Sequence, residues 1–297
     1  MKILVYGSLN IDKVYAISHL PEKGETLPAE NYEIHIGGKG LNQAISCKRT
    51  GADVYMAGKI AKDGIFLKDF LEENGVNTDF VMTDGTHTGH AVIEVDPNGQ
   101  NQMIIFGGAN REITQSECDK ILSAFDKGDL LLLQYETSCV TYMLRKAKEK
   151  GLKTAFNPSP FVDELKAVDL TLVDYLILNE DEGMRLSDET HPLTASKTLQ
   201  KLSGGVVIVT LGADGVVYCD GDEPVKLDAF HVTPVDTTGA GDTFTGFVLF
   251  SLLRSDSPVE AMRLASAASA LAITKYGAAQ TIPYMRQVTD FLTENGF

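Results

Sequence analysis

The sequence predicts an α/β protein in which helices cover both faces of a mostly parallel central sheet, a three-layer α/β/α arrangement. Three observations predict it. From about residue 129 onward, short apolar runs alternate with helical stretches, the pattern of repeated strand–helix units. Polar and glycine-rich segments follow the apolar runs, as is typical of a site at the carboxyl ends of parallel strands. Two regions, about 12–36 and 88–106, lack helical periodicity and predict a small β-sheet beside this core.

The alternating elements follow one another closely along the second half of the chain. Residues 129–134 enclose four consecutive leucines, which is typical of a buried parallel strand. A helix is expected from about residue 141 to residue 150, and Gly151 ends it. Further strands are expected near residues 153–156, 175–178 and 206–210, with helical segments between them.

Two helices are well marked in the last third of the chain. Residues 257–260, Ser-Pro-Val-Glu, combine a capping box with proline at the first helical position. They open an alanine-rich helix that is expected to run to about Lys275, with Gly277 ending it. The other helix begins at the glycine turn of residues 239–241 and runs through Leu252.

The second irregular region contains a hairpin. Residues 90–95 and 102–106 flank Asp-Pro-Asn-Gly at positions 96–99, a turn sequence between two apolar runs. We interpret the two irregular regions as a lid over the site of the main sheet, a common use of such an insertion. A hairpin without a functional role is the alternative. The whole chain, residues 1–297, is expected to form one domain that includes this lid.

The bulk composition indicates a globular protein with an acidic surface. Hydrophobic residues make up 43% and charged residues 23% of the 297 positions, and the formal net charge is −15. This charge argues against binding to nucleic acid or to anionic membranes, which require basic patches. The four cysteines are scattered, and no apolar stretch approaches the ~20 residues of a membrane helix. We therefore expect a cytoplasmic protein with reduced thiols.

Residues 236–246 have a sequence that suits phosphoryl transfer. They read Asp-Thr-Thr-Gly-Ala-Gly-Asp-Thr-Phe-Thr-Gly and place three small residues immediately before a helix. Such a turn exposes the first N–H groups of the helix, which bind anions. Asp242 lies in the first turn, where the helix dipole favours its ionised form. It can take a proton from a hydroxyl while the N–H groups hold a phosphoryl group. The alternative is an ordinary turn followed by a helix charge.

Residues 36–44, Ile-Gly-Gly-Lys-Gly-Leu-Asn-Gln-Ala, form a second glycine-rich segment before a helix. Glycine allows close approach of backbone to ligand, and Lys39 and Asn42 can direct polar groups at hydroxyls. The segment lacks the spacing of a Walker A loop. It also lacks the G-x-G-x-x-G spacing of dinucleotide sites, as do residues 7–10 after the first strand. A P-loop enzyme and a dehydrogenase are therefore disfavoured.

Several segments, taken together and in order, resemble the ribokinase-like (PfkB-type) carbohydrate kinase family. The resemblance spans nearly the whole chain, and the two glycine-rich segments match the two motifs of that family in the correct order. It implies the fold of that family, with the small sheet as a lid. The matching segments are residues 7–12, 20–26, 37–44, 178–182, 210–215, 236–246 and 275–278.

The resemblance implies a role for each matching position on the substrate side. Asp242 would be the general base, and the N–H groups of Gly239, Ala240 and Gly241 would form the anion hole. The sugar hydroxyls would be held by Asn10, Asp12, Gly38, Lys39, Gly40, Asn42 and Glu136.

On the nucleotide side, the resemblance implies ATP and Mg²⁺ as cofactors and K⁺ as an activator. Asn179 and Glu182 match a motif associated with the organisation of phosphate and Mg²⁺. The nucleotide would be lined by Thr210, Gly212 and Gly215, with Ser266 bordering the purine. A potassium-type site would use, largely through backbone carbonyls, positions Asp236, Thr238, Ala272, Lys275, Gly277 and Thr281.

Within the family, Gly-Gly-Lys-Gly-x-Asn-Gln-Ala combined with Asp12 and Glu136 looks most like the ribokinases. This implies ATP-dependent phosphorylation of D-ribose to ribose 5-phosphate. Leu41 stands where ribokinases usually have alanine, so kinases for fructose, 2-keto-3-deoxygluconate or a nucleoside are alternatives. A non-catalytic sugar-binding protein is less favoured because Asp242 and its glycine turn are intact. An uncovered lid sheet would also favour a homodimer.

Overall fold

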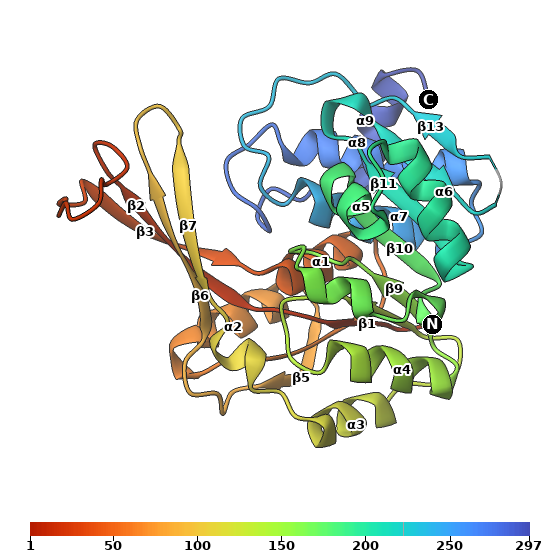
Figure 1. Ribbon diagram of the computed structural model, residues 1–297, viewed down its shortest axis with the longest axis horizontal. Coiled ribbons are helices and arrows are strands. Elements are labelled where there is room, and N and C mark those ends of the chain that lie inside the picture. Colours follow the sequence, from red (N-terminus) through yellow and green to blue (C-terminus); the bar gives the residue numbers. More distant parts are fainter. Residues whose placement is uncertain (222) are drawn as a thin grey trace.

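The computed structural model describes residues 1–221 and 223–297. A nine-stranded sheet in the order β13-β12-β11-β10-β9-β8-β1-β4-β5 runs through the molecule (Figure 1). Seven of its strands are joined by parallel pairings, and β12 and β13 complete one edge through antiparallel pairings. The strands are β1 (Ile3–Tyr6), β4 (Val54–Lys59), β5 (Asn77–Met82), β8 (Leu130–Leu133), β9 (Lys153–Phe156), β10 (Tyr175–Asn179), β11 (Val206–Thr210), β12 (Val216–Cys219) and β13 (Val225–Leu227).

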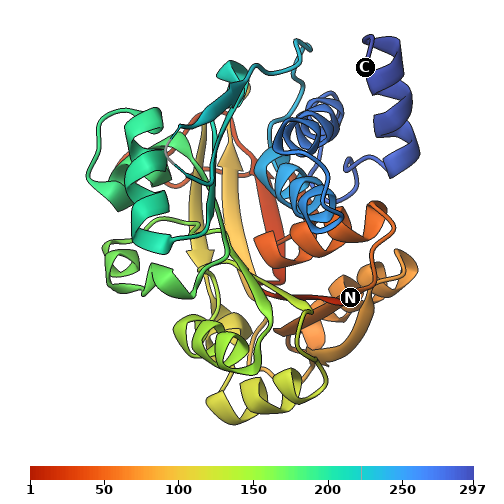
Figure 2. The same ribbon diagram turned by 90° about the vertical axis from the view of Figure 1, so that its right-hand side faces the viewer.

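Helices cover both faces of this sheet, as Figure 2 shows. Successive side chains of a strand point to opposite faces, so Ile3 and Val5 of β1 enter one core and Leu4 and Tyr6 the other. The first core is covered by α1 (Lys39–Arg49), α2 (Ile65–Glu73), α7 (Ala240–Leu253), α8 (Pro258–Ala272) and α9 (Met285–Glu294). The second is covered by α3 (Gln115–Ser123), α4 (Val140–Lys150), α5 (Glu180–Ser187) and α6 (Pro192–Ser203).

The predicted α/β alternation is confirmed. The strands expected at residues 153–156 and 206–210 are β9 and β11, and the strand expected at 175–178 extends by one residue as β10. The capping box of residues 257–260 is formed, with Ser257 and Glu260 each bonding the other's backbone N–H. Local sequence therefore determines where these elements begin.

The end of helix α8 differs from the prediction. The helix stops at Ala272 and does not reach Lys275. The carbonyl oxygen of Ile273 accepts hydrogen bonds from the backbone N–H groups of Val235 and Asp236, at 2.8 and 3.2 Å. This carbonyl oxygen therefore bonds the loop that contains Val235 and Asp236. The β-branched side chain of Ile273 also has a low helix propensity.

The two irregular regions pair into one small sheet that projects from the body of the molecule (Figure 1). The predicted hairpin is present as β6 and β7. Strand β2, from the first irregular region, pairs with β6 in parallel orientation and so joins the two regions. The small sheet begins at residue 10, slightly earlier than expected. Its strands, in the order β3-β2-β6-β7, are β3 (Asn31–Gly37), β2 (Asn10–Ala16), β6 (Gly89–Val95) and β7 (Asn101–Phe106).

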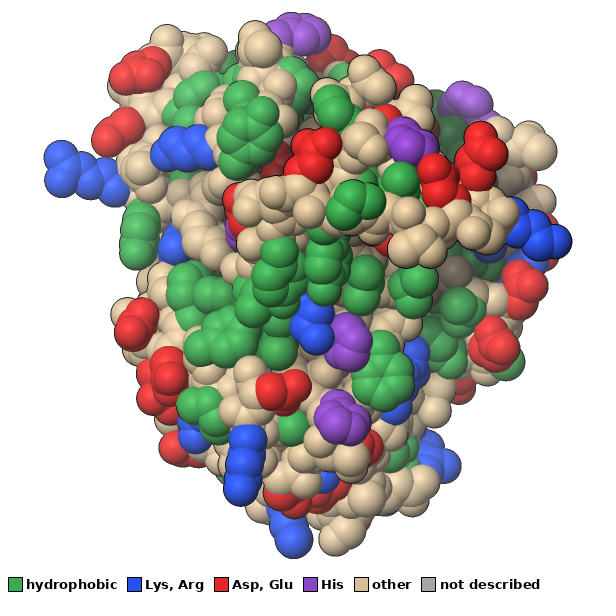
Figure 3. Space-filling model, turned by 90° about the vertical axis from the view of Figure 1, so that its left-hand side faces the viewer, with side chains coloured by type: hydrophobic (Ala, Val, Ile, Leu, Met, Phe, Trp, Pro, Cys, Tyr) green, Lys and Arg blue, Asp and Glu red, His purple; other side chains and the backbone are tan. Residues whose placement is uncertain are grey.

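The two faces of the small sheet carry different side chains. Residues paired directly across strands share a face, so Asp12 lies on one face with His35 and Lys13 lies on the other with Ile34. The face with Lys13, here called the outer face, is largely apolar. Figure 3 shows hydrophobic side chains gathered at the centre of this side of the molecule. Four exposed residues of the outer face are Tyr32, Ile34, Ile104 and Phe106.

Close contact between α1 and α7 brings the two glycine-rich segments together. A Cβ atom on Gly246 would lie 2.2 Å from Ser46 Oγ and 2.6 Å from the backbone nitrogen of Cys47, so only glycine fits there. The Oγ of Ser46 also donates to the carbonyl oxygen of Thr243 at 2.8 Å. Within the described residues, no helix has the length and apolar character needed to cross a membrane.

Candidate active site

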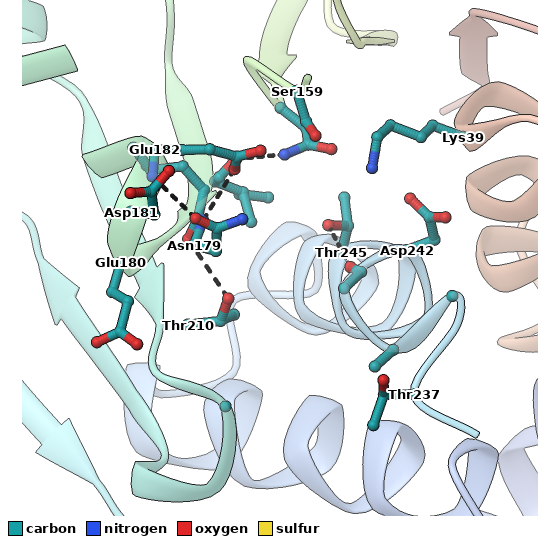
Figure 4. Close-up of a pocket in the computed structure, with 17 residues that line it drawn as sticks. Lys39, Ser159, Asn179, Glu180, Asp181, Glu182, Thr210, Thr237, Asp242 and Thr245 are labelled. Carbon is teal, nitrogen blue, oxygen red and sulfur yellow. Dashed lines mark hydrogen bonds between the residues drawn. The ribbon is translucent and has the colours of Figure 1, made fainter. Parts of the chain in front are cut away.

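A cavity of about 510 Å³ lies at the carboxyl edge of the main sheet. It is bordered by the start of α7 and by the ends of β9, β10 and β11 (Figure 4). Strand ends of a parallel sheet meet at one edge, which explains why residues distant in sequence meet here. The predicted residues that line it are Lys39, Asn179, Glu182, Thr210, Gly212, Gly239, Ala240, Gly241 and Asp242.

The glycine turn before α7 presents backbone donors to this cavity. Gly239 has φ of 76°, a left-handed conformation that glycine adopts at little cost. The N–H of Ala240 already donates to the carbonyl oxygen of Thr237 at 3.2 Å. The N–H groups of Gly241 and Asp242 have no backbone acceptor within the described part of the chain. These two groups at the helix N-terminus are therefore available to an anion. The predicted anion hole of Gly239, Ala240 and Gly241 differs from this pair, because the N–H of Ala240 is already used within the turn.

Two amide side chains from α1 hold the carboxylate of Asp242. The Nδ2 of Asn42 donates to Oδ2 and the Nε2 of Gln43 donates to Oδ1, each at 2.9 Å. Asp242 lies in the first turn of α7 and is only 6% exposed. Its position is thus fixed by both helices, as a proton acceptor with a defined direction requires.

Lys39 supplies the positive charge of the cavity. Figure 4 shows its side chain directed toward the same space as Asp242. Burial lowers the pKa of Lys39, but the carboxylates of Asp242, Glu136 and Glu182 outweigh burial and raise it. The lysine therefore stays protonated among three carboxylates.

The start of α1 depends on a glycine and fixes Glu136. Gly38 has φ of 99°, and a Cβ atom there would lie 2.7 Å from the carbonyl oxygen of Ser8. The backbone N–H of Lys39 donates to Oε2 of Glu136 at 3.2 Å, and the hydroxyl of Ser8 donates to the same oxygen. Glu136 is thereby held beside the predicted sugar residues.

Asp12 lies on the inner face of the small sheet, against the neighbouring strand. A Cβ atom on Gly37 would lie 2.2 Å from its carboxylate, so a side chain at position 37 would displace the carboxylate of Asp12. Burial and, to a smaller extent, the charge of Glu136 raise the pKa of Asp12 to about 6, and His35 opposes this rise. The charge of Glu136, which follows β8 of the main sheet, therefore acts on Asp12 of the small sheet.

Asn10 begins the same strand and is fixed by a residue that the sequence did not indicate. Its Oδ1 accepts from the Nδ2 of Asn110 at 2.8 Å, and Asn110 also bonds the backbone of Leu9. The amide NH₂ of Asn10 is then left to face a ligand.

A second cavity of about 330 Å³ adjoins the first. The two share Thr210, Gly212 and the start of α7. The predicted nucleotide residues Gly215 and Ser266 line this second cavity, together with apolar groups such as Phe230. Such a lining suits a flat heterocycle.

The motif of Asn179 and Glu182 forms a capping box at the start of α5. The N–H of Glu182 donates to Oδ1 of Asn179 at 2.8 Å, and Oε2 of Glu182 accepts from the N–H of Asn179 at 3.0 Å. Both side chains still line the large cavity (Figure 4). The motif therefore orients its own side chains at the cavity wall.

The segments predicted to hold a monovalent cation lie close together. Oδ2 of Asp236 accepts from the N–H of Gly277 at 3.0 Å, and Oδ1 accepts from Thr238. The hydroxyl of Thr281 donates to the carbonyl oxygens of Gly277 and Ala278, at 3.2 and 2.9 Å. Carboxylate, hydroxyl and carbonyl oxygens suit a hard cation. Ala272 is the last residue of α8, and Lys275 lies between it and Gly277.

Three buried residues behind Asp242 were not predicted as site residues. Gln43 contacts Asp242 directly, and it is also bonded to Asn157 and Gln134 at the ends of β9 and β8. Gln43 follows Asn42 in a helix that was already recognised, and both other residues follow buried strands. These positions, beside recognised elements, were the signal in the sequence that could have identified the three residues.

The fold and the two adjoining cavities, with a carboxylate and free helix N–H groups between them, define a kinase that phosphorylates a small molecule. The sequence profile of the pfkB family carbohydrate kinases matches residues 1–285. The chain belongs to this family and is an ATP-dependent carbohydrate kinase, as predicted.

The similar proteins include curated enzymes of nearly the same length. A ribokinase from Haemophilus influenzae is 34% identical over 98% of both chains. A deoxyribokinase from Salmonella typhi is 31% identical over 99% of this chain and all of its own.

The solved structures that resemble this chain confirm the predicted fold. A ribokinase from Thermotoga maritima is 34% identical with a TM-score of 0.89, over 98% of this chain and 99% of its own. A ribokinase from Arabidopsis thaliana complexed with ribose and ATP is 30% identical with a TM-score of 0.84, over 98% of both chains.

Proposed function

We propose that this kinase transfers the γ-phosphoryl group of ATP to D-ribose and forms ribose 5-phosphate. The observation that supports it most strongly is the position of Asp242, at the junction of the large cavity with the polar residues Asn42, Lys39 and Glu136. Such a polar set matches a polyhydroxylated ligand, since each buried polar group left unpaired costs ~1–3 kcal/mol. The 34% identity with a ribokinase along the whole chain also supports ribose.

In the proposed reaction, Asp242 accepts the proton of the O5 hydroxyl as O5 attacks the γ-phosphorus. The bond from the γ-phosphorus to the bridging oxygen breaks, and ADP leaves with that electron pair. The N–H groups of Gly241 and Asp242 and the ammonium of Lys39 stabilise the charge on the phosphoryl oxygens.

Mg²⁺ would neutralise phosphate charge when bound with ATP. No group of three or more His, Cys, Asp or Glu side chains that could hold a metal ion occurs within residues 1–221 and 223–297. Glu182 and Asn179 therefore fit a Mg²⁺ that is held mainly by phosphates and water, its usual arrangement with nucleotides. The cluster of Asp236, Gly277 and Thr281 supports K⁺ as an activator.

The test is ADP formation from ATP with ribose, 2-deoxyribose, fructose, adenosine and 2-keto-3-deoxygluconate, each with K⁺ or with Na⁺. The expected result is the highest kcat/KM for ribose, with a higher rate in K⁺. The 31% identity with a deoxyribokinase makes 2-deoxyribose the second candidate. A higher kcat/KM for 2-deoxyribose, or for any other acceptor, would replace ribose as the substrate.

We also propose that the small sheet acts as a lid on the sugar side. Asp12, whose carboxylate lies beside Glu136, is carried by this sheet. Ribose held by Asp12 and by Asn42 on α1 would then contact both the small sheet and a helix of the main body.

Affinity for ribose should fall at acid pH. Asp12 has a pKa of about 6, so below pH 6 it becomes neutral and binds hydroxyl groups less strongly. We expect KM for ribose to rise several-fold between pH 7 and pH 5. Initial rates over this range, for the native protein and Asp12→Asn, measure it. The variant should have a high KM that depends little on pH. If KM of the variant depends on pH as strongly as KM of the native protein, the role of Asp12 is contradicted.

Destabilisation of the fold by protonation of Asp12 would not explain the weaker binding of ribose at acid pH. The folded state raises this pKa, so the contribution of Asp12 to stability is present at low pH and decreases as pH rises through about 6. Acid therefore favours the fold at this group while it weakens sugar binding.

We further propose a homodimer formed by the outer faces of two small sheets. Tyr32, Ile34, Ile104 and Phe106 are exposed there, and Ile104 is 71% exposed. A second copy presents a complementary apolar face by symmetry. We expect a dimer by analytical ultracentrifugation and a monomer for Ile104→Glu. A control substitution on another surface, Leu202→Glu, should remain dimeric, and a monomeric native protein would contradict the proposal.

A further inference from the structure

The carboxylate of Asp242 is connected to the main sheet through one buried amide, that of Gln43. Its Nε2 donates to Asp242 Oδ1 at 2.9 Å and to Asn157 Oδ1 at 3.0 Å. Its Oε1 accepts from the Nε2 of Gln134 at 2.6 Å. Gln43 has no exposed surface. Both of its N–H groups and its oxygen are therefore used inside the protein.

Only one orientation of this amide satisfies its neighbours. The Nδ2 of Asn157 donates to the carbonyl oxygen of Ile177 at 2.9 Å, so its Oδ1 must face Gln43. A reversed Gln43 would place its oxygen against the carboxylate of Asp242 and the oxygen of Asn157, leaving acceptors without a donor. The ends of β8, β9 and β10 thus determine where the N–H of Gln43 points.

We propose that Gln43 is the positioning residue for Asp242. Its N–H fixes Oδ1 and hence the rotation of the carboxylate, so that Oδ2 faces the substrate hydroxyl. Gln43 is too deeply buried to touch a sugar and acts only through Asp242. The proposal rests on Asp242 being the base, and its direction matters because a misplacement of about 1 Å can cost ~100-fold in rate.

The neighbouring Asn42 has a different role. Its Nδ2 also donates to Asp242, at 2.9 Å, but its Oδ1 is buried and has no hydrogen-bond partner within the described residues. That free acceptor can receive a sugar hydroxyl. Loss of Asn42 should therefore raise KM as well as lower kcat, whereas loss of Gln43 should lower kcat alone.

The test compares Gln43→Leu and Gln43→Met with a matched control, Ser46→Ala. Methionine keeps the length of Gln43 but has no N–H for Asp242. Ser46, on the same helix, donates to the backbone of α7 and does not contact Asp242. Both Gln43 variants should lose on the order of 100-fold in kcat with KM for ribose within about threefold. The control should keep its kcat.

Asp242→Asn separates this proposal from the one it depends on. If Asp242→Asn retains turnover, Asp242 is not the base and the positioning role fails with it. If Asp242→Asn is inactive while folded Gln43→Met keeps a near-native kcat, only the positioning role is wrong. A rise in KM equal to the loss of kcat, or an equal loss of kcat in Ser46→Ala, would assign Gln43 to packing and overturn the proposal. Gln43→Met/Asp242→Asn should be no slower than Asp242→Asn, because both changes act through one carboxylate.

Discussion

Asp242→Asn is expected to lower kcat by on the order of 10³-fold while KM for ribose and for ATP changes little. An amide has the shape of the carboxylate but cannot take a proton from a hydroxyl. The side chain remains within reach of the amides of Asn42 and Gln43, so the helices should still pack. Steady-state kinetics with ribose measure the loss of kcat, and thermal unfolding measures whether the fold is retained.

Asp129→Asn is a suitable control for this variant. Asp129 is also a buried carboxylate, and it accepts a hydrogen bond from the backbone N–H of Lys2 at 2.7 Å. It precedes β8 and so lies at the opposite edge of the sheet from the cavity. This control should lose stability but not kcat. A near-native kcat in Asp242→Asn would exclude Asp242 as the base.

Lys39→Met is expected to lower kcat by on the order of 100-fold. The ammonium of Lys39 lies among the carboxylates of Asp242, Glu136 and Glu182, which raise its pKa against the effect of burial. Methionine keeps most of the volume but leaves the incoming phosphates without this charge. Rates with saturating ribose and ATP, measured across ionic strengths, test it.

Lys48→Met provides the matched control on the same helix. Lys48 lies in the last turn of α1, with its Nζ 3.4 Å from the carbonyl oxygen of Ala52, away from the cavity. This variant should retain kcat. An unchanged kcat in Lys39→Met would show that the backbone N–H groups alone stabilise the phosphoryl group.

Much of the fold could be predicted because the signals are local. The capping box at Ser257, the glycine after helix α4 and the leucine run of β8 each determine their own element. The two glycine-rich segments also predicted that Lys39, Asn42 and Asp242 belong to one site. The direct bond between Asn42 and Asp242 fits that expectation.

What could not be predicted depends on contacts between distant segments. The end of α8 is set by a loop whose backbone bonds the carbonyl oxygen of Ile273. The network of Gln43 with Asn157 and Gln134 requires three strand ends and a helix to meet, and no spacing in the sequence encodes that meeting. The role of Asn110 beside Asn10 likewise arises from two loops that come together only in the folded chain.

The sugar residues are divided between two sheets, with Asp12 on the small sheet and Asp242 at the edge of the main one. A ligand must be long enough to reach from one to the other in order to use all of these groups. A water molecule near Asp242 cannot do so, because it has no second hydroxyl to offer Asp12. Binding energy that only a sugar can supply therefore favours transfer to the sugar over wasteful hydrolysis of ATP.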